Sequence, residues 1–354
     1  MAAEGMDILV VAGDPWRSDY LRYATDLTPS EGQVFAFVER ESVVRVITES
    51  PVEAARFRAE QGDLQVTWSL SPIEEAEAAI RSLGSSARIG LAPVAAIPLR
   101  LAAGPLRASL EPATALLDRL MLRKSALEID ALRSAAALAD DGYTAFREAA
   151  SAGRPEYELV AEVEAFFRSR GCPENFQILA SGGREVRGMH PPGERRLARG
   201  DLVTTELTPC VHGYYAQICR TLVIGAPSEA QLGAFAVYDE ALAAGVAAVR
   251  PGATAGDVAR AQNDVFRRHG LGDYVTSEYT RVRGHGLGLY VDGQPALLED
   301  IGLVFESDMT VVVHPNTYHP EVGYFVHGDS VRVTEAGCEV LTRTPRRLFS
   351  VPAE

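Results

Sequence analysis

The feature that most restricts the fold of this chain is a weak internal repeat in its C-terminal part. The segment GRPEYELVAEVEAFFRSRG (153–171) aligns without gaps with GATAGDVARAQNDVFRRHG (252–270), 99 positions later. Both copies share an acidic residue near the start, an apolar stripe at helical spacing, a Phe, an Arg and a final Gly. The pattern predicts one capped amphipathic helix in each copy. Two copies are too few for a solenoid, so the repeat indicates an old duplication.

Each copy is followed by strand-like sequence with a histidine close to glycine. These segments are RGMHPP around His190 and RGHGLG around His285. The arrangement predicts two similar α+β halves that face each other. Binding pockets form readily at interfaces of this kind, so we expect the functional site between the halves.

The first third of the chain has a different character. Short apolar runs such as DILVVAG and VVRVIT alternate with helix-like stretches such as SPIEEAEAAIRSL, which is the signature of an α/β unit. From Leu122 onward, Ala-rich sequence with apolar residues at helical spacing takes over. We expect an α/β domain over residues 1–122 and a second domain over residues 123–354.

Composition narrows the classes of partner. The chain has 34 Lys plus Arg against 48 Asp plus Glu, and its formal charge of -14 repels phosphate backbones and anionic lipid. We therefore expect a small-molecule substrate, with neither nucleic acid nor membrane as a partner. The four cysteines form no CxxC pair, which argues against a disulfide framework or a thiolate zinc site. The N-terminus lacks a basic region before its apolar run, so we expect a cytoplasmic protein.

Residues 122–345 resemble the creatinase and aminopeptidase P family, whose catalytic domain has the pita-bread fold. The resemblance rests on six segments in the family's order: LMLRKSALEIDALRSAAALAD, RGMHPPGERRLARGDLV, GDLVTTELTPCVHGYYAQICRTLVIG, RGHGLGLYVDGQP, DMTVVVHPN and GYFVHGDSVRVTEAGCEVLT. It implies an N-terminal α/β domain followed by a duplicated α+β pita-bread domain with a curved, mostly antiparallel sheet. It also implies a homodimer.

The resemblance implies an altered metal site. Metal-dependent members use two Asp, one His and two Glu to hold two divalent ions that activate a water. The corresponding positions in this chain hold Glu206, Gln217, His285, His314 and Gly328. Neither Gln217 nor Gly328 can bridge two cations as a carboxylate does, so we expect no dinuclear centre and no cleavage of Xaa-Pro peptides. A shift of the last hairpin by one residue places His327 at the final position, which also removes the carboxylate.

Other positions suggest catalytic and substrate-binding roles. His190 resembles the family's substrate-side histidine, and Asp292 stands where a second histidine usually follows the glycine loop. In the metal-free creatinase branch the equivalent of His285 is the general acid and base, but the glutamate of that branch falls on Cys219. The candidate catalytic residues are His190, His285 and Asp292, and the candidate substrate contacts are His190, Arg187, Tyr215 and Cys219. Arg187 can pair with a substrate carboxylate, although a solvated loop also explains it; Cys219 is a nucleophile or a buried apolar residue.

Three interpretations of Glu206, His285 and His314 remain open. Two imidazoles and one carboxylate suit one divalent ion, Fe(II) first and Mn or Zn next, with Gln217 or His327 near it. Metal-free hydrolysis or elimination through His285 and His190 is the second interpretation. Polar residues that satisfy one another in a binding or scaffold protein are the third. Titratable groups gathered in one pocket favour an enzyme, which we expect to act on an amino acid derivative, a cyclic amidine or a modified peptide.

Overall fold

The computed structural model describes residues 5–39, 43–84, 86–103 and 110–353. Its internal contacts divide the chain into two compact units, Met1–Met121 and Leu122–Glu354. The division lies one residue before the boundary that the change in sequence character suggests.

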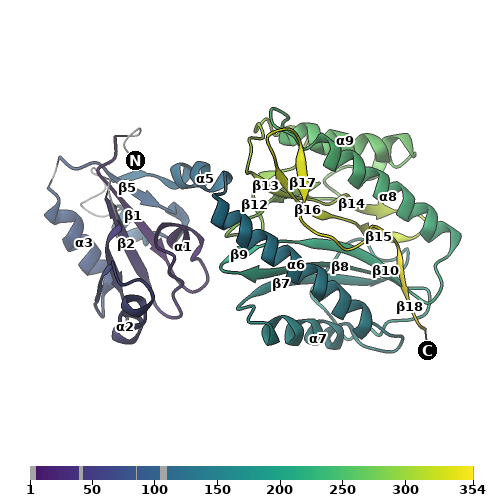
Figure 1. Cartoon of the computed structure of the whole chain (residues 1–354), viewed down its shortest axis with the longest axis horizontal. Helices are drawn as coiled ribbons and strands as arrows, with labels where there is room; N and C mark the ends of the chain where they lie inside the picture. Colours follow the sequence, from purple (N-terminus) through teal and green to yellow (C-terminus); the bar gives the residue numbers. More distant parts are fainter. Residues whose placement is uncertain (1–4, 40–42, 85, 104–109, 354) are drawn as a thin grey trace. The chain divides into compact units, whose positions relative to one another are not determined.

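The N-terminal unit is a six-stranded mixed sheet with helices packed against it (Figure 1). Its strands are β1 (Ile8–Gly13), β2 (Val34–Glu39), β3 (Val43–Thr48), β4 (Gln65–Trp68), β5 (Ile89–Ala92) and β6 (Leu110–Pro112), in the order β4-β3-β2-β1-β5-β6. Its helices are α1 (Asp19–Thr25), α2 (Pro51–Glu60), α3 (Pro72–Ser82), α4 (Leu99–Ala103) and α5 (Thr114–Leu122). The central strand β1 reads ILVVAG and is buried throughout, as a strand covered on both faces must be.

The C-terminal unit contains two five-stranded sheets, a hairpin and four long helices. One sheet has the order β18-β10-β8-β7, with β9 paired to β8, and is made of β7 (Asn175–Gly182), β8 (Leu202–Val211), β9 (Tyr214–Tyr215), β10 (Ile218–Ile224) and β18 (Phe349–Val351). The other has the order β12-β11-β13-β16-β17 and is made of β11 (Gly284–Gly286), β12 (Gly293–Ala296), β13 (Thr310–Val313), β16 (Asp329–Val333) and β17 (Cys338–Val340). The hairpin joins β14 (Asn316–His319) to β15 (Gly323–Val326), and the helices are α6 (Ala126–Ala149), α7 (Glu156–Ser169), α8 (Glu229–Ala248) and α9 (Ala255–Arg268).

The internal repeat corresponds to two equivalent helices. Helices α7 and α9 begin and end 99 positions apart, as the aligned segments predict. The glycines on both sides of each helix are Gly153, Gly171, Gly252 and Gly270, and all four have positive φ values between 74° and 83°. Such values favour glycine because it has no Cβ. The helix starts differ, since Thr254 caps α9 through a capping box whereas no side chain caps α7.

Each half of this unit has its own hydrophobic core. Helices α6 and α7 pack against β8 and β10 through residues such as Phe146 and Phe167, whereas α8 and α9 pack against β13 and β16. Figure 1 shows α8 and α9 on one side of the strands and α7 on the opposite side. Nine of the ten residues of β8 are buried, because this strand lies between a helix layer and other strands. Side chains on β8 that do not face the helices must therefore face the second half.

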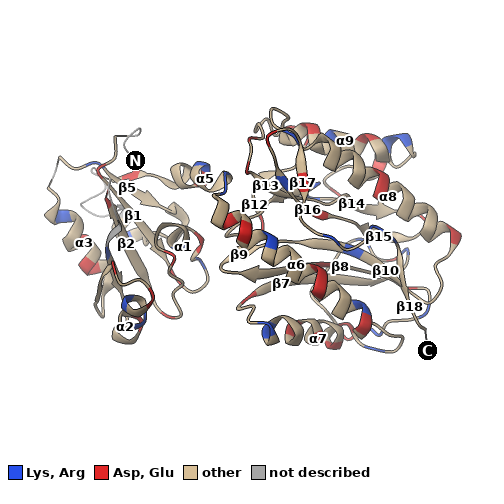
Figure 2. Cartoon of the chain, viewed as in Figure 1, with Lys and Arg blue, Asp and Glu red and all other residues tan. Residues whose placement is uncertain are grey.

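Charged residues lie mainly on the helices and loops. Figure 2 shows Asp and Glu interspersed with Lys and Arg along the outer faces of the helices. Within the described residues, no helix combines the length and the apolar character that a membrane crossing requires.

Candidate active site

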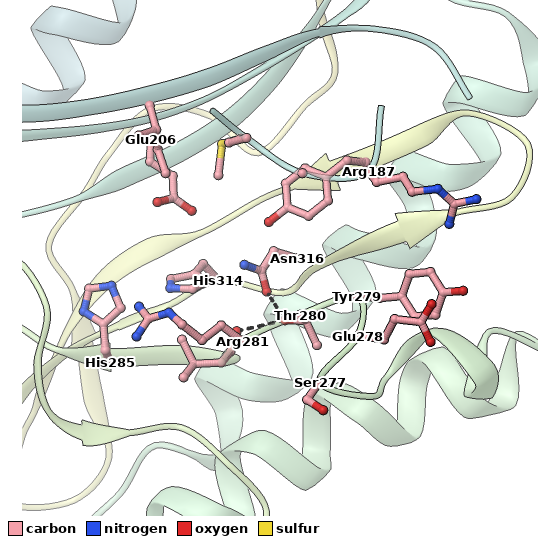
Figure 3. Close-up of a pocket in the computed structure, with 15 residues that line it drawn as sticks. Arg187, Glu206, Ser277, Glu278, Tyr279, Thr280, Arg281, His285, His314 and Asn316 are labelled. Carbon is pink, nitrogen blue, oxygen red and sulfur yellow. Dashed lines mark hydrogen bonds between the residues drawn. The ribbon is translucent and has the colours of Figure 1, made fainter. Parts of the chain in front are cut away.

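A pocket of about 320 Å³ lies where strands of the two halves of the C-terminal unit meet. Figure 3 shows side chains from β8, β11 and the ends of β13 and β14 around it, together with the segment 277–282. The lining residues are Ile178, Arg187, Gly188, Met189, Glu206, Ser277, Glu278, Tyr279, Thr280, Arg281, Val282, His285, His314, Asn316 and Tyr324. The position agrees with the expectation of a site between the duplicated halves.

Glu206 contributes a buried carboxyl group to the pocket. Its residue on β8 is paired with Cys219 on β10 and with Ile178 on β7, and only 7% of its surface is exposed. Its carboxyl group makes no hydrogen bond or ion pair within the described residues. Burial raises the pKa of Glu206 to about 7, although the positive charge of Arg281 opposes the shift. Near neutral pH this group therefore exists in both its protonated and its ionised forms.

His285 is held between two neighbouring strands by glycines. A Cβ atom at Gly284 would lie 2.1 Å from the carbonyl oxygen of Val312, and one at Gly286 would lie 1.9 Å from that of Gln294. Only glycine on both sides lets β11 fit between β12 and β13, which explains the GHG sequence. Burial lowers the pKa of His285 below its ordinary value of 6.5, so the ring is neutral at pH 7.

The Nδ1 atom of His285 has two polar neighbours. It lies 3.1 Å from the carbonyl oxygen of Gly286, to which an Nδ1–H donates, and 3.7 Å from Oδ1 of Asp292. Asp292 also forms an ion pair with Arg281. A proton on Nδ1 leaves the lone pair on Nε2.

His314 follows β13 and lies beside His285. The two ring centroids are 5.2 Å apart, with an angle of 65° between the ring planes. His314 is 3% exposed, and neither of its ring nitrogens finds a hydrogen-bond partner within the described residues. Burial lowers its pKa well below the ordinary value, and the proximity of His285 adds to this shift. The pocket thus contains two neutral imidazoles and one carboxyl group.

Comparisons with known proteins place this site in a family. The model of metallopeptidase family M24 matches residues 130–335. The chain belongs to metallopeptidase family M24. It is 31% identical over 232 residues to the Xaa-Pro dipeptidase of Pyrococcus furiosus, a match that covers 65% of this chain and 66% of that protein. It is 31% identical over 235 residues to the creatinase of a Bacillus species, which covers 63% of this chain and 57% of that protein.

Solved structures show the same fold over the whole chain. The prolidase from Pyrococcus horikoshii aligns with a TM-score of 0.84 at 23% identity, and covers 99% of this chain and 97% of that one. An X-Pro aminopeptidase from Thermotoga maritima aligns with a TM-score of 0.87 at 21% identity. These likenesses confirm the predicted fold, an N-terminal α/β domain followed by a pita-bread domain. The curated relatives include dipeptidases and creatinase, while each of the two sequence matches above leaves about a third or more of the relative's length uncovered.

The paired-ion centre that the M24 resemblance implies does not fit the residues present. Gln217 is an amide, and its Nε2 atom donates to Sγ of Cys219 at 3.2 Å. Gly328 has no side chain, and a Cβ atom there would lie 2.5 Å from Cβ of His314. The backbone around His314 therefore leaves no space for a carboxylate at position 328. Neither position 217 nor position 328 can therefore supply a carboxylate that bridges two ions.

A single-ion site is also not preformed. Glu206, His285 and His314 line the same pocket, as the resemblance suggested. Within the described residues, however, no group of three or more His, Cys, Asp or Glu side chains is close enough to hold a metal ion. The unbonded nitrogens of His314 remain available to a ligand that enters the pocket.

Several candidate residues lie away from the pocket. His327, considered as an additional ligand, has its Nε2 atom 3.3 Å from Asp239 on helix α8 and its ring against Phe235. His190 is exposed, and its Nδ1–H donates to the carbonyl oxygen of Pro191 at 2.7 Å. Neither histidine lines the pocket. That His327 joins a metal site and that His190 faces the substrate therefore stay predictions, which the lining of this pocket does not support.

The other predicted site residues also include some that line the pocket and some that do not. Arg187 lines the pocket and Asp292 approaches His285 from outside it. Cys219 and Tyr215 are buried and do not line it. Burial raises the pKa of Cys219 well above its ordinary value, which favours the alternative of a buried apolar residue over a nucleophile.

Sequence reasoning missed part of the pocket wall. The segment TSEYTR (276–281) supplies five of the lining residues, and Asn316 and Tyr324 come from the β14–β15 hairpin. The hydroxyl of Thr280 donates to Oδ1 of Asn316 at 2.8 Å, which ties the segment to the hairpin. The only available signal was proximity in sequence, since this polar run directly precedes the glycine-flanked His285.

Proposed function

We propose that this protein is a hydrolase that cleaves a C–N bond in a small nitrogen-containing molecule without the paired-ion centre of its family. An amino acid derivative, a cyclic amidine and a modified peptide all belong to this class. The observation that supports it is the content of the pocket: a carboxyl group with a pKa of about 7 stands with two neutral imidazoles, while both bridging carboxylates are missing. Perturbed titratable groups in one pocket are typical of acid–base sites.

His285 is the general base in this proposal. Its Nδ1–H is held by the carbonyl oxygen of Gly286, so Nε2 carries the lone pair that removes a proton from water. The water oxygen forms a bond to the carbon of the C–N bond. When the C–N bond breaks, its electron pair stays with nitrogen, and the nitrogen takes a proton from the imidazolium of His285. In its protonated form, Glu206 donates a hydrogen bond to the atom that gains electron density, the carbonyl oxygen of an amide or a nitrogen of an amidine.

The test is amine release from a panel of amides, ureas and amidines by chelator-treated protein. His285→Asn should lower the rate by about 10²–10⁴-fold, the usual contribution of a general base. His269→Asn is the matched control, because His269 is exposed and pairs with Glu240 outside the pocket. Activity that is lost on chelation and restored by metal, or a His285→Asn variant as active as the wild type, overturns the proposal.

A single-ion enzyme is the second candidate, and the unbonded nitrogens of His314 favour it. Glu206, His285 and His314 would hold the ion, with Fe(II) first and Mn or Zn next, because two imidazoles and one carboxylate form the facial set of mononuclear iron sites. A bound ion would supply Lewis-acid or oxygen-dependent chemistry. Anaerobic titration with Fe(II) distinguishes the candidates: one equivalent bound by the wild type and lost in His314→Ala supports the ion, and no uptake supports the metal-free site.

A further inference from the structure

The segment 276–282 borders two cavities, the active-site pocket and a second cavity of about 330 Å³. We call the second one the α9 cavity, because Ala259, Asn263 and Arg267 of helix α9 form one of its walls. The loop 297–300, which follows β12, forms another wall. A cavity of this volume is large enough for a small organic molecule.

The two cavities share four lining residues but no candidate catalytic group. The shared residues are Ser277, Thr280, Arg281 and Val282, and Figure 3 shows the first three on the border of the active-site pocket. Glu206, His285 and His314 do not line the α9 cavity. A molecule in the α9 cavity would therefore contact the wall of the active site without touching its acid and base groups.

The walls of the α9 cavity are mainly aliphatic. The aliphatic lining residues are Ala259, Val275, Val282, Leu297 and Leu298. A hydrocarbon group that fills this space removes both its own surface and that of the walls from water, which favours binding. The lining therefore suits a ligand with an aliphatic chain.

One buried cation, Arg283, also lines the α9 cavity. It is 2% exposed, and two hydrogen bonds fix the plane of its guanidinium group. Its Nε atom donates to Oδ1 of Asn263, and its Nη1 atom donates to the carbonyl oxygen of Asn316. The Cζ atom lies 4.9 Å from the ring centroid of Phe266, which adds a cation–π contact. The positive charge thus has a fixed position in the cavity wall.

The guanidinium group of Arg283 has no anionic partner within the described residues. No carboxylate there forms an ion pair with it, and its Nη2 atom has no hydrogen-bond partner. The other two arginines that line the cavity are paired, Arg267 with Glu299 and Arg281 with Asp292. Buried charged side chains are almost always paired, because a charge removed from water without compensation is unfavourable. Arg283 therefore lacks the partner that its burial requires.

Two acidic residues also line the α9 cavity, and neither compensates Arg283. Glu299 accepts hydrogen bonds from Asn263 and Arg267, so its charge is already paired. Asp300 is exposed to solvent, where its charge is screened. The unpaired charge that remains inside the cavity is positive.

We infer that the α9 cavity is a second ligand site, which binds a small aliphatic carboxylate with its anionic group at Arg283 and its hydrocarbon chain against the aliphatic walls. One free guanidinium nitrogen among aliphatic walls suits a monoanion with a hydrocarbon chain better than a strongly hydrated phosphate. The bound ligand also holds the shared segment 276–282 in place. The site does not depend on the reaction in the active-site pocket, since no candidate catalytic group lines it.

Isothermal titration calorimetry on the full-length wild type tests the inference with three matched probes. 4-Methylpentanoate has the chain and the charge, 4-methylpentanamide replaces the carboxylate by a neutral group of the same shape, and acetate lacks the chain. Acids with one methylene fewer or more cover the depth of the cavity. We expect the best acid to bind about tenfold or more tightly than its amide and than acetate.

Three variants assign the binding to the α9 cavity. Arg283→Gln should remove the preference for the acid over the amide. Arg268→Gln is the matched control, because Arg268 is an exposed arginine of α9 that pairs with Glu240 and does not line the cavity. Arg187→Gln tests the active-site pocket, which Arg187 lines, and should leave the affinity for the acid unchanged.

A further variant and a second measurement cover the case in which Arg283→Gln fails to fold. Leu298 is 37% exposed, so Leu298→Glu should fold and should weaken binding of the acid more than that of the amide. Hydrogen exchange by mass spectrometry should show that the amides of residues 276–283 exchange several-fold more slowly with the acid bound. Equal affinity of the wild type for acid and amide, no binding of any acid up to about 10 mM, or loss of binding in Arg187→Gln overturns the inference.

Discussion

The C-terminal unit buries two polar clusters on neighbouring strands, and they differ in how well their members are paired. The first, which we call the paired cluster, is centred on Arg220 and Asp329, both no more than 1% exposed. Arg220 donates to Oδ1 of Asp329 at 2.7 Å, and Asp329 also accepts from Thr342 at 2.8 Å and from Arg346 at 2.7 Å. The second lies in the active-site pocket, where Glu206 and His314 have no partners within the described residues.

Side-chain alternation along the strands separates the two clusters. Gln217 and Cys219 share one face of the strand region, where Cys219 pairs with Glu206, while Arg220 points to the opposite face. Gly328 and Asp329 alternate in the same way at the start of β16. Neighbouring strands therefore carry a closely paired network, in which Nε of Arg220 lacks a partner within the described residues, and a pocket whose polar groups are unpaired.

The contrast also appears in the two buried carboxyl groups. Burial alone would raise the pKa of Asp329, but the guanidinium groups of Arg220 and Arg346 outweigh it and lower the pKa. Burial dominates at Glu206 and raises its pKa to about 7. Removing a charged group should therefore lower the free energy of unfolding in the paired cluster and raise it in the pocket.

The largest effect on folding is expected from Asp329→Ala. The change leaves Arg220 as an uncompensated buried charge, so the free energy of unfolding should fall by about 3–5 kcal/mol in a denaturant titration. Asp264→Ala is the control, since its pair with Arg267 is exposed and contributes at most about 1 kcal/mol. Similar losses in both variants would contradict the assignment of a structural network.

Glu206→Gln should stabilise the fold, and only at high pH. The folded-state pKa of about 7 exceeds the ordinary value of 4.5, so the folded chain binds the proton more tightly and wild-type stability falls as pH rises between these values. At about pH 8 the chelator-treated variant should be more stable than the wild type by up to roughly 3 kcal/mol. The difference should shrink to about 1 kcal/mol near pH 5 and vanish below about pH 4, where the carboxyl group is protonated in both the folded and the unfolded state.

The control for this pH series is Glu335→Gln. Glu335 is exposed, so its replacement should change the unfolding free energy by less than about 0.5 kcal/mol at either pH. Destabilisation by Glu206→Gln at pH 8 would mean that the carboxylate has a partner in the folded protein, and would remove the contrast between the clusters.

Gly328→Ala should cost about 1–3 kcal/mol of unfolding free energy, because the new methyl group overpacks the wall behind His314. A Cβ atom there lies 2.5 Å from Cβ of His314 and 2.8 Å from the carbonyl oxygen of Val313. Gly337→Ala, between β16 and β17, is the matched control, since a Cβ atom at Gly337 meets nothing within 4 Å. Equal stability of the two variants would show that position 328 tolerates a side chain.

The sequence predicted the fold well because the duplication and six ordered segments each fix local structure. The repeat located α7 and α9, and the glycines around His285 located a strand that only glycine can flank. These signals are local, since they depend on helix ends and on close backbone approach.

The site was predicted less completely because the direction of a side chain depends on packing between distant segments. His327 follows the last residue of β15 and turns toward α8, and His190 turns outward beside Pro191. The wall segment 276–282 has no periodic pattern, and its position depends on the contact between Thr280 and Asn316. Nothing in the order of residues alone indicates these directions.

The smallest expected effect is the absence of an activity that relatives have. The curated relatives include Xaa-Pro dipeptidases, yet the protein should not cleave Xaa-Pro dipeptides even with added Mn(II) or Co(II). Gln217 cannot bridge two ions, and Gly328 has no space for a carboxylate, so added metal has no paired site to fill. Proline release should stay at the level of the His285→Ala variant, measured in parallel. Gln217→Asp should not introduce proline release, because position 328 still lacks its ligand. Metal-dependent proline release by the wild type above the level of His285→Ala would show that the pocket assembles a paired centre from other residues.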